Sequence, residues 1–159
     1  MPITDAMRAR HVVRQYPSTP LPDDVIAALR SRIEENNRAH GTDIRLVTGD
    51  ARVFGPLWGT VRARSVRHCP IMSGPDAPDL DERLGYGGAD LMLAAQDLGL
   101  NTWWIGGTFS KRAAARVRGA PGTIVAVVAL GSRAPHGSAH PPKRTQEVAS
   151  PDARGPGRS

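Results

Sequence analysis

The apolar run IVAVVAL at residues 124–130 constrains the fold of this chain more than any other segment. It is unbroken and rich in β-branched side chains, a composition typical of a central strand whose two faces are both covered. It is far too short to cross a membrane as a helix. The run therefore predicts an inner strand of a sheet, with other parts of the chain packed on both faces.

Helical and extended patterns alternate in the sequence before this strand. Residues 88–100 carry apolar side chains at helical spacing, and residues 101–105 have the pattern of a strand. Residues 110–119 follow as a helix that Ser110 caps and Gly119 closes. Helix, strand, helix and strand in this order indicate an α/β or α+β domain with one principal sheet.

The N-terminal half is expected to contribute three helices, one of them short, and two strands. The clearest amphipathic helix spans residues 22–37, and a shorter helix is expected over residues 3–12, with Thr4 as its candidate cap. Alternating side chains predict a strand at residues 43–49. A further strand is expected near residues 69–72, after a short helix.

The composition changes at Ser132. From there to the end of the chain, Pro, Gly, Ser, Ala, His and Arg dominate and no aromatic residue occurs. Such a segment cannot form a core of its own, so it is either disordered or laid over another surface. We therefore expect a domain at residues 1–131 and an extended or disordered tail at residues 132–159.

Charge and cysteine content limit the partners and the compartment. The formal net charge is +6, mostly from arginine, which favours an anionic partner such as a phosphate, a nucleotide, a nucleic acid or a membrane surface. The single cysteine, Cys69, excludes an internal disulfide and suits a reducing compartment. The N-terminal residues MPITDAMRAR lack the hydrophobic region of a secretory signal, so a cytoplasmic protein is expected.

The segment NTWWIGGTFSK at residues 101–111 places two tryptophans and two glycines around one strand end. The glycines leave backbone N–H groups accessible to a flat ligand, and the helix that follows adds the positive end of its dipole. Such a site suits a planar heteroaromatic ring such as isoalloxazine. The alternative is a tight turn with the tryptophans in the core.

A group of basic residues near the N-terminus forms the second candidate site. Arg10, His11 and Arg14 lie within one short segment, and the guanidinium fork matches phosphate oxygens in pairs. A flavin mononucleotide needs both a phosphate clamp and a platform for its ring. The alternative is a solvated basic surface without a ligand.

Three segments resemble the FMN-dependent nitroreductases. RARHVVRQY at residues 8–16 resembles the opening motif of that family, and GYGGADLMLAAQDLGLNTWWIGGTFSK at residues 85–111 is similar to its long helix and the segment that follows. The closest resemblance is to a small branch of the family that carries WIGGTF. PPKRTQEV at residues 141–148 resembles the family's last basic segment.

The resemblance implies a set of FMN-binding residues. The phosphate and ribityl chain would be held by Arg10, His11 and Arg14, with Lys143 or Arg144 completing the clamp, from the same subunit or from its partner. The residues along the flavin ring would be Ile105, Gly106 and Gly107, with the Gly107 N–H near N5 and O4.

The resemblance also implies a fold and an activity. The fold would be α+β, with a central, mostly antiparallel sheet flanked by helices, in an intertwined homodimer. NAD(P)H would reduce FMN, which would then reduce a nitroaromatic, a quinone or a related small-molecule acceptor by a ping-pong hydride mechanism. The cofactor carries this chemistry. No protein side chain is therefore expected to be catalytic, and no metal site is expected.

One departure from the family keeps a second hypothesis open. Where the family usually has a Gln-Pro-Trp type stretch that contacts the flavin, this chain has ENNRAHGTDIRLV, in which Asn36 or Asn37 would have to substitute. The alternative function is therefore a non-catalytic flavin- or nucleotide-binding module. A nucleic-acid binder is a third hypothesis, disfavoured because no recognition helix and no aromatic platform accompany the basic residues. No nucleic-acid or membrane partner is expected.

Overall fold

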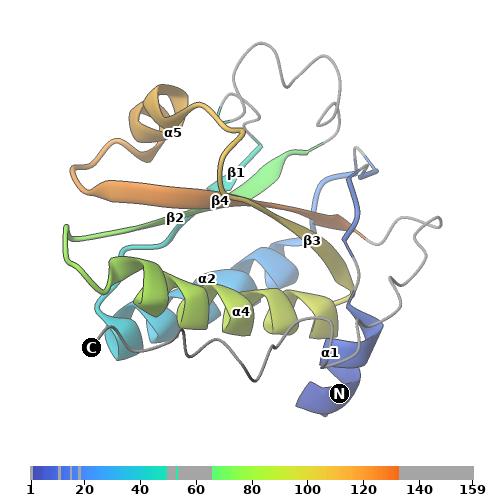
Figure 1. Ribbon diagram of the computed structural model, residues 1–159. Helices are drawn as coiled ribbons and strands as arrows, with labels where there is room; N and C mark the ends of the chain where they lie inside the picture. Colours follow the sequence, from blue (N-terminus) through green and yellow to red (C-terminus); the bar gives the residue numbers. More distant parts are fainter. Residues whose placement is uncertain are drawn as a thin grey trace, which may run out of the picture.

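The computed structural model describes residues 2–10, 12–14, 16–17, 19–49, 53 and 66–132. The helices in this part of the chain are α1 (Ile3–Ala9), α2 (Asp23–His40), α4 (Leu80–Asp97) and α5 (Lys111–Arg118). The strands are β1 (Arg45–Thr48), β2 (His68–Gly74), β3 (Leu100–Ile105) and β4 (Thr123–Ser132). Figure 1 shows that they form one sheet between helices.

The sheet is antiparallel throughout, in the order β1-β2-β4-β3. Val127 of β4 pairs with Ile71 of β2 on one side and with Ile105 of β3 on the other. Every residue from Ala126 to Leu130 is at most 1% exposed. The prediction of an inner strand, drawn from the apolar run, is confirmed, and so is the α+β fold with an antiparallel sheet.

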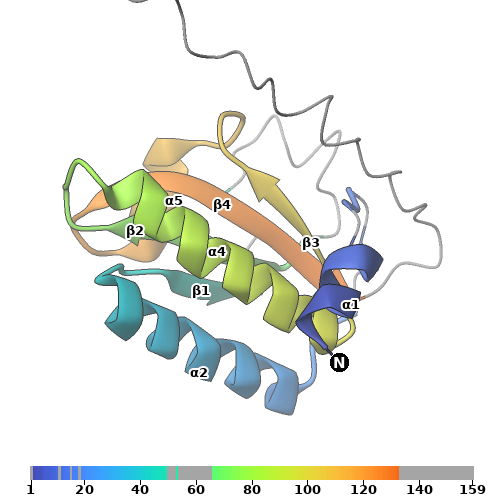
Figure 2. The same cartoon turned by 60° about the horizontal axis from the view of Figure 1, so that its bottom comes forward.

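Helices cover both faces of the sheet (Figures 1 and 2). α2 and α4 pack side by side on one face, where Leu29, Leu84 and Leu91 are fully or almost fully buried. α5 lies on the other face, where Ala114 is buried against the strands. The core is therefore two apolar layers separated by the sheet.

A polar cluster joins α2 to α4. Arg32 makes two hydrogen bonds to the Asp90 carboxylate, from Nε at 2.7 Å and from Nη2 at 2.5 Å. Asn36 donates to the same carboxylate at 2.9 Å and to the Gly87 carbonyl at 3.0 Å. These bonds fix the lateral register of the two helices.

Two details of the first helix were predicted wrongly. Thr4 is not its cap: Pro2 occupies the N-cap position, and no side chain caps the helix. The helix also ends at Ala9, and Arg10 is already extended, with φ −68° and ψ 128°. The chain leaves the helix there because Val12 pairs with Thr102 of β3.

Two helices extend beyond their predicted ends, α2 at its C-terminus and α4 at its N-terminus. α2 continues to His40 and ends at Gly41, which has a φ of 60°. α4 begins at Leu80, eight residues before the predicted start at residue 88. The caps of α5 are confirmed, because Ser110 Oγ accepts from the Ala113 N–H at 3.2 Å and Gly119 has a φ of 68°.

The predicted strands at residues 43–49 and 69–72 correspond to β1 and β2. Cys69 of β2 is fully buried, and burial raises the pKa of its thiol, which makes it a core residue rather than a nucleophile.

The short helix expected before β2 lies outside the described residues, as do residues 133–159 of the expected tail. In the part of the chain that the structure describes, no helix is long and apolar enough to span a membrane.

Candidate functional site

The N-terminal segment and β3 bring together the two regions singled out from the sequence. Val12 forms an isolated parallel bridge with Thr102, so the chain after α1 runs alongside the outer edge of β3. Arg10 and Arg14 flank this bridge in the sequence, one two residues before it and one two residues after it. The basic segment and the tryptophan strand are therefore neighbours in space.

Arg10 contacts the middle of β3. Its Nη1 donates to Thr102 Oγ1 at 3.5 Å, and the arginine is only half-buried. It also lines a cavity of about 220 Å³ between α1 and α4, together with Met7, Ala89, Met92 and Leu93. The guanidinium group is thus held at the strand edge and remains accessible to a ligand.

Arg14 contacts the next residue of the strand. Its guanidinium carbon lies 5.4 Å from the centroid of the Trp103 ring, within the range of a cation–π interaction. Neighbouring residues of a strand point to opposite faces, so Thr102 and Trp103 receive the two arginines on opposite sides of the outer edge of β3. The edge of β3 therefore carries two cationic groups, one at each of two consecutive residues.

The two tryptophans divide between the two core layers. Trp103 packs against the layer that contains α5, and Trp104 packs against the layer under α2 and α4. Both are half-buried. Each indole therefore has packing contacts with the core.

Gly106 and Gly107 follow β3 and are exposed. A Cβ added to Gly107 would meet no atom within 4 Å, and one added to Gly106 would meet only Trp104 Nε1, at 3.6 Å. Among the described residues, neither glycine N–H has a hydrogen-bond partner. The strand end thus presents open backbone donors, while Ile105 beside them is buried.

The spacing of these groups suits an elongated ligand. Strand residues advance by about 3.3 Å each, so Gly106 lies roughly 13 Å beyond Thr102 along β3. Cationic groups stand near the middle of the strand, and flat, open backbone donors stand at its end. The donor set fits FMN, which has a phosphate at one end and a planar ring with nitrogen and oxygen acceptors at the other.

Tyr16 is a residue of this region whose role the sequence reasoning missed. It is 4% exposed, and its hydroxyl donates to the Ala129 carbonyl at 3.3 Å. Burial raises the pKa of this hydroxyl, against the opposing effect of the positive charge of Arg10. A Cβ on Gly131 would lie 2.9 Å from the tyrosine ring. Tyr16 therefore anchors the basic segment to β4, and the aromatic at the end of RARHVVRQY is the signal that could have identified it.

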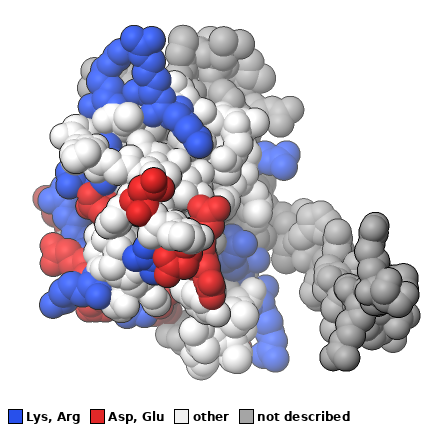
Figure 3. Space-filling model, turned by 60° about the vertical axis from the view of Figure 1, so that its left-hand side comes forward, with Lys and Arg blue, Asp and Glu red and all other residues white. Residues whose placement is uncertain are grey.

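The exposed side of α5 adds further positive charge. Lys111, Arg112 and Arg116 are exposed on this helix, and basic side chains gather over it at the top of Figure 3. The helix begins four residues after Gly107. Its charges raise the positive potential on the side of the molecule that carries the open strand end, which favours anionic ligands.

The amides of Asn36 and Asn37 are already used within the fold. Asn36 bonds Gly87 and Asp90, as described above. Asn37 accepts from the Ile44 N–H at 2.7 Å and donates to the Ile44 carbonyl at 2.9 Å. Both side chains therefore hold α2 in place, and neither is available as a substitute flavin contact without breaking these bonds.

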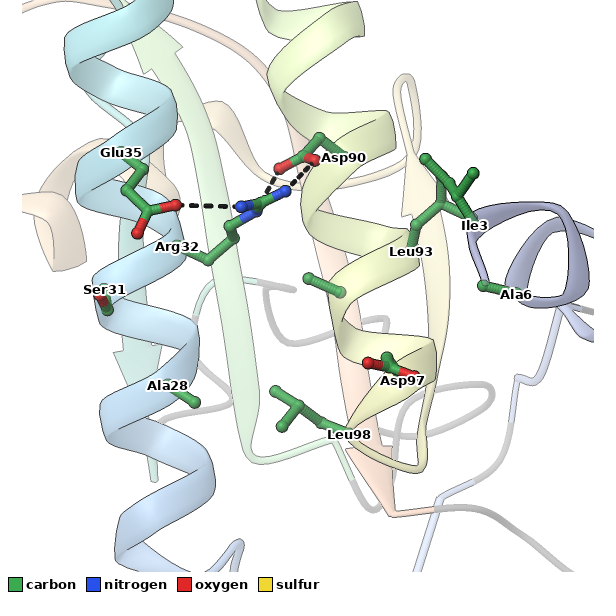
Figure 4. A pocket seen from close by; sticks show the side chains of 11 residues that line it. Ile3, Ala6, Ala28, Ser31, Arg32, Glu35, Asp90, Leu93, Asp97 and Leu98 are labelled. Atoms are coloured by element: carbon green, nitrogen blue, oxygen red, sulfur yellow. Dashed lines mark hydrogen bonds and ion pairs between the residues drawn. The ribbon is translucent and has the colours of Figure 1, made fainter. Parts of the chain in front are cut away.

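A larger groove, of about 510 Å³, lies between α2 and α4 with α1 at one end (Figure 4). Arg32, Glu35 and Asp90 form its polar part, and Ile3, Leu93 and Leu98 its apolar part. None of the predicted FMN-binding residues that the structure describes lines it. The larger of the two hollows is therefore not the candidate site. The candidate site is defined instead by the cationic groups and the open N–H groups along β3.

Three of the predicted FMN-binding residues, His11, Lys143 and Arg144, lie outside the described residues. Among the described ones, no group of three or more His, Cys, Asp or Glu side chains is placed to hold a metal ion.

Solved structures show the same fold. A "Putative NADH dehydrogenase/NAD(P)H nitroreductase" from Parabacteroides distasonis has a TM-score of 0.74 at 16% identity, with 95% of this chain and 98% of that chain covered. A "putative nitroreductase in complex with fmn" from Desulfovibrio desulfuricans has a TM-score of 0.71 at 18% identity, with 94% and 95% covered. NADPH:FMN oxidoreductase from Vibrio harveyi, complexed with NAD⁺, has a TM-score of 0.70 at 16% identity, with 94% and 76% covered.

Sequence comparison identifies the family. No curated protein matches the chain. The family model described as "Putative TM nitroreductase" matches residues 2–154, nearly the whole length. This match and the shared fold confirm the resemblance first drawn from the sequence motifs: the chain belongs to the nitroreductase family that this model describes.

Proposed function

We propose that this protein is an FMN-dependent oxidoreductase that uses NAD(P)H to reduce a nitroaromatic, a quinone or a related small acceptor. The observation that supports this most directly is the arrangement on β3, where Arg10 and Arg14 flank the strand and Gly106 and Gly107 leave its end open. Membership of the nitroreductase family supports the same proposal.

In this proposal each end of FMN has its own set of residues. Arg10, His11 and Arg14 would hold the phosphate and the ribityl chain between them, and Lys143 or Arg144 would complete the clamp. Ile105, Gly106 and Gly107 would lie along the ring, and the Gly107 N–H would donate near N5 and O4. FMN, when bound, supplies hydride acceptance and donation. The protein orients the ring, donates one hydrogen bond to it and covers it with apolar surface.

The protein is further proposed to act as a homodimer. Three large apolar side chains around α1 are exposed: Ile3 and Met7 by 62% each, and Val12 by 49%. Leu98, at the end of α4, is 37% exposed. A second copy of the chain that covered these residues would remove apolar surface from water next to the proposed phosphate site.

The test is the visible spectrum of the purified chain after FMN is added and the excess removed, followed by anaerobic NADH or NADPH. Retained flavin absorbance that bleaches with either nucleotide is the expected result. Absence of retained flavin would contradict the proposal, because the residues on β3 would then bind no cofactor.

A second candidate function is a non-catalytic flavin-binding module. The observation that favours it is the engagement of the Asn36 and Asn37 amides within the fold, which leaves the usual flavin contact after the second helix without a substitute. Flavin that is retained but is not bleached by either nucleotide would support this module over the enzyme.

A further inference from the structure

The two ends of the Trp104 indole have different surroundings. Its benzo end lies against α4 at Gly88, and its nitrogen end lies at the end of β3, where a Cβ on Gly106 would be 3.6 Å from Nε1. We propose that the Trp104 N–H is a hydrogen-bond donor of the flavin site and binds an acceptor atom of the flavin ring. This inference rests on the proposed function, in which the ring lies along Ile105, Gly106 and Gly107.

The indole N–H of Trp104 is open. It has no hydrogen-bond partner among the described residues, and the side chain is only half-buried. Within the same part of the chain, Nε1 is the only atom within 4 Å of the position that a Gly106 Cβ would take. A tryptophan nitrogen can only donate, and in most folded proteins a buried one has an acceptor. The acceptor that is missing here can therefore come from a ligand.

Neither the backbone conformation nor the packing of the described residues requires glycine at position 106. Gly106 does not have the positive φ that favours glycine, and 3.6 Å is an ordinary van der Waals distance for a methyl group. An acceptor bonded to the indole N–H would lie about 3 Å from Nε1, so a side chain at position 106 would compete with it for the same space. The glycine thus keeps the side chain of Trp104 accessible.

The indole adds a side-chain donor to a set of backbone donors. Gly106 and Gly107 present N–H groups at the same strand end, with no partner among the described residues. Donors alone fit a ligand edge that carries only acceptors, such as the edge of the flavin ring with N5 and O4. Trp104 packs against the core layer under α2 and α4, which fixes its ring before any ligand binds. Binding to its N–H therefore costs little side-chain entropy.

The experiment measures the dissociation constants of FMN and riboflavin by flavin fluorescence, and the visible spectrum of each bound flavin. Two changes remove the donor: Trp104→Phe, and replacement of Trp104 by benzothienylalanine, which keeps the shape of the indole but has sulfur in place of the N–H. We expect the sulfur analogue to weaken the binding of both flavins by the same factor, about 2- to 10-fold, the range of one neutral hydrogen bond. Trp104→Phe should weaken it at least as much.

The visible band of the bound flavin should also shift in both variants, because its position depends on hydrogen bonds to the ring. Arg10→Ala is the contrasting change at the other end of the proposed site. It should weaken FMN binding more than riboflavin binding, since only FMN carries the phosphate, and should leave the band in place.

Three results with the sulfur analogue would overturn the inference. Full affinity for both flavins would leave the N–H without a role. A loss of FMN affinity alone would place the contact at the phosphate end. Weaker binding of both flavins without a shift of the band would make Trp104 a packing residue rather than a donor.

Gly106→Ala tests the same inference without changing the indole. Its methyl would stand 3.6 Å from Nε1, in the space that a ring acceptor needs, so it should weaken the binding of both flavins. Full affinity in this variant would overturn the inference even if the changes at Trp104 prevent folding, which thermal unfolding of each variant checks. Failure of the proposed function would look different, because the unchanged chain would then bind neither flavin.

Discussion

Gly88 of α4 lies directly against the indole of Trp104. A Cβ on Gly88 would come within 3.0 Å of this ring and within 2.9 Å of the terminal methyl of Met72. The helix can approach β3 this closely because the position has no side chain. Gly88, which by itself disfavours a helix, is thus required by the packing of the strand beneath it.

Replacement of Gly88 by alanine should destabilise the protein by about 1–3 kcal/mol, since an added methyl would force the indole from its position. The matched control is Gly85→Ala in the same helix, where a Cβ would meet nothing within 4 Å. That change should stabilise the fold by about 0.5–1 kcal/mol through helix propensity. Urea unfolding of both variants checks this. Destabilisation of similar size in both would contradict the account.

The bidentate contact between Arg32 and Asp90 should contribute measurably to stability. Burial opposes ionisation of Asp90, but hydrogen bonds from Arg32 and Asn36 outweigh it and lower the pKa of this carboxyl. Arg32→Gln should cost about 1 kcal/mol, because the pair is partly exposed. The control, Arg8→Gln, removes a more exposed pair with Asp5 and should change the unfolding free energy by less than about 0.5 kcal/mol. Equal effects would mean that the α2–α4 contact is no stronger than a surface ion pair.

Acid should destabilise the fold through His68. Its Nε2 accepts from the Leu21 N–H at 3.4 Å, and burial, followed by the charge of Arg67, lowers the pKa of the imidazole. An unfolded histidine binds a proton below a pH of about 6.5, while the folded one still does not. The contribution of His68 to stability is therefore complete above about pH 6.5 and declines as the pH falls toward the folded pKa.

Urea unfolding between pH 7.5 and pH 5 measures this effect. The variant His68→Gln should have a shallower loss of stability on acidification than the unchanged protein. An unchanged slope in the His68 variant would contradict the assignment.

Arg10→Ala should weaken FMN binding roughly 10- to 100-fold if this arginine bonds the phosphate, the value of one charged hydrogen bond. Arg8→Ala is the control, because Arg8 lies two residues earlier, is exposed and pairs with Asp5. It should bind FMN as the unchanged chain does. Flavin retention measured by ultrafiltration checks both, and equal retention in the Arg10 variant would remove that residue from the site.

A charge placed on α1 should disrupt the proposed dimer. Met7→Glu is expected to shift the protein to monomer in gel filtration with light scattering, since Met7 is 62% exposed beside the cavity that Arg10 lines. Tyr86→Glu is the control, because Tyr86 is 66% exposed but lies beside His40 near the end of α2. A monomer in the unchanged protein would contradict the proposal directly.

Local patterns predicted the parts of this fold that depend on neighbouring residues. The apolar run gave the inner strand β4, and Ser110 and Gly119 gave both ends of α5. The start of α4 was missed because Gly85, Gly87 and Gly88 interrupt the helical pattern. The glycine at position 88 is accepted because of its close tertiary contacts with Trp104 and Met72, which helix propensity does not contain.

The site could be predicted only as a set of residues. The contacts of Arg10 and Arg14 with Thr102 and Trp103 depend on the register of two segments about ninety residues apart, which nothing in either segment specifies. The burial of Arg118 is a similar case. Its guanidinium bonds Asp43 and the carbonyls of Ala120 and Pro121, whereas its sequence position suggests only a basic helix end.

The bridge between Val12 and Thr102 also bears on how the protein avoids aggregation. β3 is the last strand of the sheet, and such a strand offers unpaired N–H and C=O groups to other chains. The N-terminal segment lies along this edge, with Arg10 and Arg14 on either side of the bridge. Its backbone covers part of the edge, and the two positive charges repel a second copy of the same edge. A chain shortened to begin after residue 14 should therefore self-associate through β3.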